Sequence, residues 1–178
     1  MTESPRTDLA DFTAAELAHA FRRGWAGPVE TFEAVLKRIE ASEPALNALW
    51  ALDVEGARAA ARASQARWRM GEPLSDLDGV PCTIKENIAT KGVAVPLGAA
   101  STELRPAAED SPPAARLREA GATIFAKTTM PDYGMLSSGL SSFHKLARNP
   151  WNLALNPGGS SAGAGAAAAA GYGPLHLG

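Results

Sequence analysis

The sequence predicts an α/β domain, in which helices cover a small sheet, and three observations support this class. The first 75 residues carry apolar side chains at the three- and four-residue spacing of helices. Residues 79–88 and 122–126 have the length and apolar character of buried strands. A helix ended by glycine is predicted over 112–121, directly before the second strand, and this succession is typical of α/β proteins. We therefore expect a helical segment over 1–75 and an α/β core over 76–178.

The helical segment contains three predicted helices. Thr13 and Glu16 match a capping box, in which each side chain accepts a hydrogen bond from the backbone of the other, so the first helix starts directly after Thr13. Pro28 is tolerated in the first turn of a helix and starts the second one. The third helix runs from about residue 54 to residue 70, and Gly71 ends it.

Lys85 lies at the end of the first predicted strand. Val80, Cys82 and Ile84 alternate onto one face of that strand, which leaves Lys85 on the other face. Active sites of α/β folds commonly lie at the carboxyl ends of strands. Burial there lowers the pKa of a lysine and lets its neutral amine act as a base, whereas the alternative is an ordinary solvated lysine.

The composition excludes several classes of protein. The 178 residues are 46% hydrophobic and 20% charged, which excludes global disorder. A net charge of -2 argues against a nucleic-acid-binding protein, and the single cysteine, Cys82, excludes an internal disulfide. The sequence has neither a secretory leader pattern nor an apolar run that could span a membrane, so we expect a cytoplasmic protein. The three histidines lack metal-ligand spacing, and we expect neither a metal nor a cofactor.

The C-terminal part of the sequence is unusual in charge and composition. Residues 149–178 contain no charged side chain, and we expect them to be buried between other layers. Within them, residues 158–171 consist only of Gly, Ala and Ser, with five consecutive alanines at 166–170. One interpretation is a flexible linker. The other is a tight loop that leads into a helix packed on all sides and holds Ser160 or Ser161 for acyl chemistry.

Three segments together resemble one enzyme family. They are GVPCTIKENI at 79–88, GATIFAKTTMPDYG at 121–134 and RNPWNLALNPGGSSAGAGAAAAAG at 148–171. In this order and spacing they resemble the amidase signature family, whose members hydrolyse carbon–nitrogen bonds of amides. The resemblance covers the chain from about residue 13 to its end. It implies an α/β/α fold with a central mixed sheet covered by helices, and a small-molecule amide as the substrate.

The resemblance also implies roles for individual residues. The family uses a Ser–cis-Ser–Lys triad, in which the lysine matches Lys85 and the bridging serine matches Ser160. The peptide bond before that serine is cis in the family, which here is the bond between Gly159 and Ser160. Gly134 matches a position whose backbone lines the substrate pocket, and Ser161 is the second residue that we expect to bind substrate.

The chain departs from the family pattern at three points. Ala162 and Ala164 stand where the family has a second glycine pair and serine, and Glu86 stands where it has an aspartate. The nucleophilic serine of the family lies well beyond the bridging serine, past Gly178. We therefore expect one incomplete, truncated domain that is cut off before its nucleophile and is inactive alone.

Three functions remain open from the sequence. The first is an amidase of which this chain is the N-terminal portion. The second is a non-catalytic remnant or an interaction subunit. The third is the A subunit of a tRNA-dependent amidotransferase, the only case in which a nucleic acid would be a partner. A homodimer is a further alternative, with Trp25 and Trp50 on the helical segment as interface residues. No membrane partner is expected.

Overall fold

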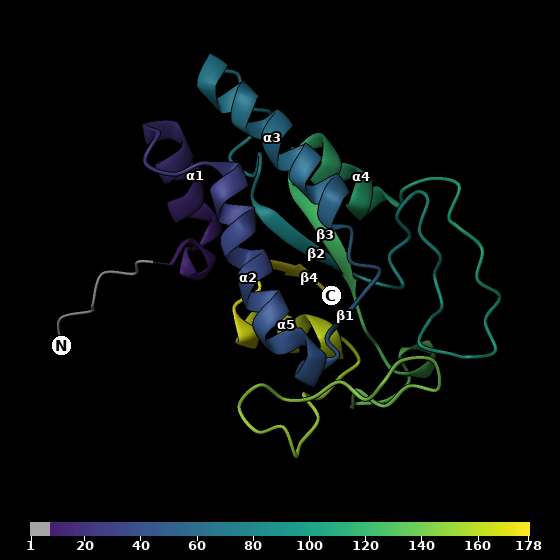
Figure 1. The fold of residues 1–178 in the computed structure, drawn as a ribbon. Coiled ribbons are helices and arrows are strands. Elements are labelled where there is room, and N and C mark those ends of the chain that lie inside the picture. Colours follow the sequence, from purple (N-terminus) through teal and green to yellow (C-terminus); the bar gives the residue numbers. More distant parts are fainter. Residues whose placement is uncertain (1–7) are drawn as a thin grey trace.

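The computed structural model describes residues 8–178, which form a four-stranded sheet with helices on both faces (Figure 1). In chain order the elements are η1 (Leu9–Asp11), α1 (Ala14–Arg23), α2 (Pro28–Leu46), β1 (Leu49–Trp50), α3 (Val54–Met70), β2 (Pro81–Lys85), α4 (Pro112–Glu119), β3 (Thr123–Thr128), η2 (Asp132–Gly134), α5 (Ala162–Ala170) and β4 (Leu175–Leu177), where η1 and η2 are short 3-10 helices.

The sheet is mixed, with the strand order β1-β3-β2-β4. β2 runs parallel to both β3 and β4, whereas the two-residue β1 pairs antiparallel with β3. Side chains of α2, α3 and α5 share one apolar cluster on one face of the sheet, and α4 covers the other face. This arrangement confirms the predicted α/β/α architecture with a central mixed sheet.

The larger apolar cluster joins the helical N-terminal segment to the core. Phe32 of α2 lies against Phe125 of β3, with ring centroids 5.9 Å apart. Ala57 of α3 and Ala166 of α5 are fully buried in the same cluster. Because many of its members are alanines, the helices approach the sheet closely. The complete set of buried residues is Ala10, Phe32, Val35, Ile39, Leu46, Ala48, Ala57, Ala61, Phe125, Ala126, Ala166, Ala167 and Tyr172.

The predicted helix boundaries are confirmed. The capping box at the start of α1 is present, because Thr13 Oγ1 accepts from the backbone of Glu16 and the Glu16 carboxylate accepts from the backbone of Thr13. Pro28 opens α2, and Gly71 ends α3 in the left-handed conformation that favours glycine.

The strand at 79–88 is shorter and more deeply buried than its alternation predicts. All five residues of β2 are buried, including Thr83 and Lys85 on the face opposite Cys82 and Ile84. Cys82 and Ile84 pack with α4, whereas Lys85 faces α5. Because helices cover both faces, the polar side chains of this strand lie inside the protein rather than in solvent.

The prediction that the charge-free segment is buried is wrong for residues 151–156, which are exposed; the exposed fraction of Trp151 is 85%. These residues form local turns that satisfy their own backbone groups. Asn149 Oδ1 accepts from the backbone of Trp151, and the backbone of Asn149 donates to the carbonyl of Leu155. A segment whose backbone is satisfied in this way needs no burial, even without charged side chains.

The prediction that the alanine-rich helix is packed on all sides is also wrong. The flexible-linker interpretation fails, because α5 is a regular helix whose buried side contains Gly163, Ala166 and Ala167. Its other side is exposed at Gly165 and at 168–169. A helix beside a sheet buries one face, and small side chains on the remaining face reflect high helix propensity.

The two tryptophans suggested as interface residues differ in exposure. Trp25 is 74% exposed and stands edge-on to the ring of His19. Trp50 is half-buried and packs against the rings of Phe143 and His144. Within residues 8–178, no helix combines the length and the apolar character that crossing a membrane requires.

A buried ion pair ties α3 to the segment before β2. The carboxylate of Asp78 is fully buried and accepts from Nε and Nη2 of Arg67 at 2.7 and 2.6 Å. It also accepts from the backbone of Leu74 at 2.9 Å, and its own carbonyl accepts from the indole of Trp68. The pair therefore holds the C-terminal end of α3 against the start of the sheet.

We expect Asp78 to contribute to the pH dependence of stability. Burial alone raises the pKa of Asp78, but hydrogen bonds from Arg67 and Leu74 outweigh burial and hold it below its ordinary value of 3.8. The unfolded chain therefore binds this proton more readily, so the stabilisation is complete above about pH 3.8 and is lost as the pH falls through the lower folded-state value. Asp78→Asn should lower the free energy of unfolding at neutral pH, with a difference from wild type that shrinks below pH 3.8. Urea unfolding over this pH series checks it, and a constant difference would contradict it.

Candidate active site

Lys85 lies at the carboxyl end of β2, facing the loop that precedes α5. Its Nζ donates hydrogen bonds to Oγ of Ser160 and to Oγ of Ser161, both at 2.9 Å. The side chain of Lys85 is buried, whereas both serines are half-buried. Two residues more than seventy positions away in sequence therefore converge on one amine.

The backbone around Ser160 is tightly held. The peptide bond between Gly159 and Ser160 is cis, as the family resemblance implies. A Cβ atom at Gly159 would lie 2.6 Å from the carbonyl oxygen of Ser138 and 2.8 Å from that of Leu136. The preceding residue, Gly158, has φ = +88°, in the left-handed region. Lack of space favours glycine at position 159 and the backbone conformation favours it at position 158, which explains the glycine pair of the motif.

α5 is anchored directly behind the two serines. The backbone of Gly163 donates to the carbonyl of Thr129 at 2.9 Å, and the backbone of Thr129 donates to the carbonyl of Ala48 at the same distance. Ser161 is the residue immediately before the helix, so the N-terminal end of α5 points toward the amine of Lys85. That end carries the positive partial charge of the helix, which disfavours an ammonium group beside it.

Gly134 lies on the other side of Ser160. A Cβ atom at Gly134 would be 3.7 Å from Ser160 Oγ, and its φ of +71° again favours glycine. Residues on both sides of Gly134 in the sequence line a cavity of about 510 Å³. Its walls are mainly apolar and comprise Asp132, Tyr133, Met135, Leu136, Leu140, Ser141 and Ser142.

Burial shapes the protonation of the lysines in this region. Burial lowers the pKa of Lys85 below its ordinary value of 10.5, and the neighbouring charge of Glu86 partly opposes this. Lys127 of β3 is also buried, and burial lowers its pKa to about 8 against the opposing charges of Glu86 and Asp110. Lys127 Nζ donates to Thr90 Oγ1 at 3.0 Å and to the carbonyl of Ile88. Lys85 is thus favoured as a proton acceptor relative to a surface lysine.

Glu86 and His144 form a contact that no sequence pattern indicates. The Glu86 side chain is fully buried, and its Oε2 lies 2.6 Å from Nε2 of His144, whose side chain is 8% exposed. The two residues are 58 positions apart. Neither has a motif-like neighbour that would link it to the other. Only the glutamate in the position after Lys85 could have drawn attention to this contact.

The last described residue also lies at this site. β4 pairs with β2 in parallel register, with Leu177 opposite Ile84. A Cβ atom at Gly178 would lie 2.9 Å from Oγ of Ser161. The carboxyl ends of β2 and β4 and the N-terminal end of α5 therefore meet around Lys85, Ser160 and Ser161.

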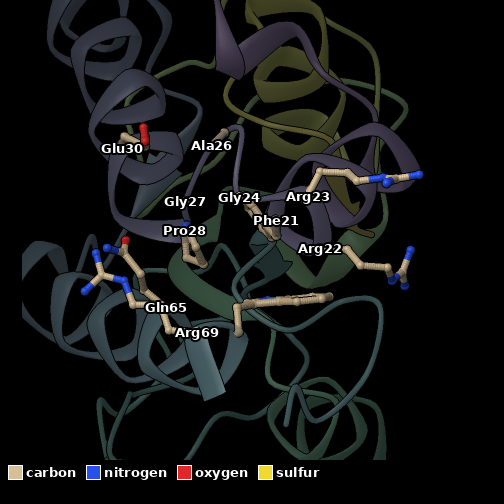
Figure 2. A pocket seen from close by; sticks show the side chains of 11 residues that line it. Phe21, Arg22, Arg23, Gly24, Ala26, Gly27, Pro28, Glu30, Gln65 and Arg69 are labelled. Carbon is tan, nitrogen blue, oxygen red and sulfur yellow. The ribbon is translucent and has the colours of Figure 1, made fainter. Parts of the chain in front are cut away.

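A second cavity lies apart from this site and contains none of its residues. It has a volume of about 360 Å³ and lies among α1, α2 and α3, lined by residues such as Arg22, Arg23 and Arg69 (Figure 2). Figure 2 shows the guanidinium groups of Arg22 and Arg23 extending away from Pro28. Among residues 8–178, no group of three or more His, Cys, Asp or Glu side chains is placed to hold a metal ion.

All four residues singled out from the sequence lie together in the structure. Lys85 contacts Ser160 and Ser161 directly, and Gly134 faces Ser160. Alanine is accommodated at position 162 without backbone strain, because Ala162 is the first residue of α5 and has no positive φ. The hydrogen bond between Ser161 and Lys85 adds a contact that a purely substrate-binding role for Ser161 does not require.

Comparison with known proteins supports the family that the sequence motifs indicate. A model of the amidase family matches residues 30–178. The chain is 42% identical over 173 residues to the A subunit of the glutamyl-tRNA(Gln) amidotransferase of Salinispora tropica, an alignment that covers 97% of this chain and 35% of that protein. The chain thus spans about a third of the length of this relative.

Solved structures give the same result for the fold. A crystal structure of an amidase superposes with a TM-score of 0.85 at 34% identity, over 94% of this chain and 38% of that one. The native peptide amidase of Stenotrophomonas maltophilia superposes with a TM-score of 0.84 at 29% identity, over 92% of this chain and 35% of that one. With its sequence motifs and its fold both matched over most of its length, the chain belongs to the amidase signature family.

Proposed function

We propose that this chain supplies two residues of the catalytic machinery of an amidase that cleaves carbon–nitrogen bonds of linear amides. Lys85 is the base and Ser160 is the bridging serine of a Ser–cis-Ser–Lys triad. The nucleophilic serine belongs to sequence beyond Gly178. The observation that carries the proposal is the pair of hydrogen bonds from a buried lysine to Ser160 and Ser161.

Each residue has a defined task in this mechanism. Neutral Lys85 accepts the proton of the Ser160 hydroxyl while Ser160 accepts the proton of the nucleophile, which attacks the amide carbon. When the carbon–nitrogen bond breaks, the proton returns through Ser160 to the leaving nitrogen, so the amine departs neutral. Ser161 holds the amine of Lys85 from a second direction, and it contributes to the substrate-binding surface with the backbone of Gly134.

The substrate enters next to Gly134. The apolar walls of the 510 Å³ cavity beside this residue favour an amide with an apolar substituent over a charged one. A side chain at position 134 would approach Ser160, so glycine keeps the space in front of the bridging serine open. A small-molecule amide is therefore the proposed substrate class.

The proposal is tested on the native gene product. Intact-mass measurement of the natively expressed protein establishes which polypeptide carries residues 1–178. Hydrolysis of a simple aryl amide by that protein, followed as release of the aryl amine, then measures the activity. Turnover that requires Lys85 supports the proposal, and a native product without a nucleophilic serine after Gly178 removes its basis.

We expect the polypeptide of residues 1–178 alone to show no amide turnover. It contains Lys85 and Ser160 but no serine in the position of the family nucleophile, so no side chain is in place to attack the amide carbon. Loss of the oxyanion donors that accompany the nucleophile would remove a further factor of roughly 10²–10³. The assay is aryl-amine release by the purified 1–178 chain, with its Lys85→Ala variant as the blank. Turnover above that blank would contradict this expectation and would point to Ser160 or Ser161 as a nucleophile.

A second candidate function is the A subunit of a glutamyl-tRNA amidotransferase. The observation that favours it is the 42% identity to such a protein over nearly the whole of this chain. The same lysine and serine would then release ammonia from an amide donor, and partner subunits would be required. Purification of the native protein as a multi-subunit complex with glutamine-dependent activity would favour this function over a free amidase. Purification without partners and without turnover would favour a non-catalytic remnant.

A further inference from the structure

Glu86 is a fully buried carboxyl group that follows the proposed base directly in the chain. Its side chain is fully buried, and its backbone donates to the carbonyl of Thr128 at 3.1 Å, which fixes the start of the turn after β2. Oε2 contacts His144, whereas Oε1 has no hydrogen-bond partner among residues 8–178. Burying a carboxylate costs free energy of folding unless another group compensates its charge. We therefore expect Glu86 to have a role at its position after Lys85.

His144 is held rigidly against this carboxylate. The backbone of His144 donates to Oγ of Ser141 at 2.9 Å. Its ring packs against the ring of Phe143 at 4.8 Å and that of Trp50 at 5.7 Å. The imidazole thus approaches Glu86 from a separate loop with its orientation set by packing, and it donates Nε2–H to the carboxylate when the proton resides on that nitrogen.

We propose that Glu86 and His144 form a positioning pair for Lys85. The pair clamps the loop that carries His144 onto the end of β2, and it fixes the carboxylate of the residue that follows Lys85. Glu86 thereby sets the pH range in which Lys85 can accept a proton, and His144 keeps the carboxylate in place. Neither Glu86 nor His144 lines the 510 Å³ cavity proposed for the substrate, so both are expected to act through Lys85.

The charged groups around the pair come from several parts of the fold. Lys85 precedes Glu86 in the chain, and the charge of Glu86 acts on the pKa of Lys85 and of Lys127 on β3. His144 contacts Glu86 from the loop after η2, and the charge of His144 is felt by Asp132 of η2 itself. The pKa of Lys127 is also raised by the charge of Asp110, in the loop before α4, and lowered by the charge of Arg118 on α4. Glu86 is thus the carboxylate that acts on both buried lysines, whereas Asp110 acts on Lys127.

The two carboxylates act on different lysines, so substitution of Asp110 provides a matched control for substitution of Glu86. Glu86→Gln keeps the shape of the side chain and removes its charge, so both Lys85 and Lys127 should lose a proton at lower pH. Asp110→Asn removes a charge that acts on Lys127 and should leave Lys85 unchanged. A difference between the two variants at Lys85 separates a local charge effect from a general loss of stability.

The experiment uses the 1–178 chain with ¹³Cε-labelled lysine. The chain has five lysines, Lys37, Lys85, Lys91, Lys127 and Lys145, and single Lys→Arg variants assign their resonances. We expect the Lys85 titration midpoint to move to lower pH in Glu86→Gln and to stay in place in Asp110→Asn. An unmoved Lys85 midpoint in Glu86→Gln would overturn the proposal.

The inference rests on the proposed role of Lys85 as a base, and the same titration separates the two. A Lys85 midpoint equal to those of the exposed lysines in the unmodified chain would remove the basis of the proposed function. A Lys85 midpoint that lies below those of the exposed lysines but does not change in Glu86→Gln would be consistent with the proposed function and would reject the positioning pair.

The clamping role of His144 has its own readout. His144→Leu removes the partner of the buried carboxylate and should lower the Tm, whereas His144→Gln retains an N–H donor and should restore most of the loss. The double variant Glu86→Gln/His144→Leu should lose less than the sum of the two single variants, because no charged group is then left without its partner. Strictly additive losses, or failure of His144→Gln to restore the Tm, would overturn the pair.

Discussion

We expect Lys85→Ala to lower kcat/KM for aryl-amide hydrolysis by the native gene product about 10²–10⁴-fold, the usual contribution of a positioned base. The variant removes the amine to which both Ser160 and Ser161 are bonded. Ser160 then has no group to which it can pass its proton. The measurement is the steady-state rate of aryl-amine release by purified native and variant protein.

The control for this variant is Lys91→Ala, because Lys91 is an exposed lysine six residues further along the chain. It should leave kcat/KM unchanged. The rate of the native protein should also rise with pH through the pKa of Lys85, since only the neutral amine accepts a proton. Burial places that pKa below the ordinary value of 10.5, so the rise should be complete at lower pH than a surface lysine allows. Equal activity of the Lys85→Ala and Lys91→Ala proteins would refute the proposed base.

The second large effect concerns the fold around the site. We expect Gly163→Ala to destabilise the chain by about 3 kcal/mol, at the upper end of what overpacking usually costs. The new Cβ would lie 2.2 Å from the carbonyl oxygen of Ala48 and 2.4 Å from the backbone nitrogen of Thr129. Both are backbone atoms, so α5 must move away from the sheet and the hydrogen bond from Gly163 to Thr129 is strained.

Gly165→Ala is the matched control, two residues further along the same helix. A Cβ there meets no atom within 4 Å, and replacing an exposed helical glycine by alanine gains up to about 1 kcal/mol. The two variants make the same chemical change with opposite expected signs. Denaturant unfolding of the 1–178 chain measures both, and a Gly163→Ala protein as stable as Gly165→Ala would show that the close approach of α5 does not constrain the fold.

The local elements can be predicted from the sequence because their signals are local. A capping box at Thr13, a proline at position 28 and glycines such as Gly71 determine where helices begin and end from residues within one turn. Strand positions follow from short apolar runs bounded by glycine. The predicted burial of 151–156 is wrong, because a segment without charge needs no burial where local turns satisfy its backbone.

The candidate site is only partly accessible from the sequence. Pattern alone marks Lys85 and the two serines as candidate site residues, and the family resemblance assigns Lys85 and Ser160 to one triad. The additional bond from Lys85 to Ser161 and the contact between Glu86 and His144 depend on which loops the sheet brings together. No spacing rule links residues 58 positions apart, because their distance is decided by the packing of the elements between them.

The sequence by itself determined the helices, the strands, the glycines that the tight loop requires and the membership of an amide-cleaving family. The helices, strands and glycines follow from backbone preferences and side-chain size over a few residues. The family follows from the resemblance of three motifs in their order and spacing. Only the tertiary structure decided that Lys85 is buried against two serines and that the carboxylate of the next residue is buried against His144. The protonation of an amine depends on the solvent and the charges within a few ångströms, and long-range packing alone determines what those are.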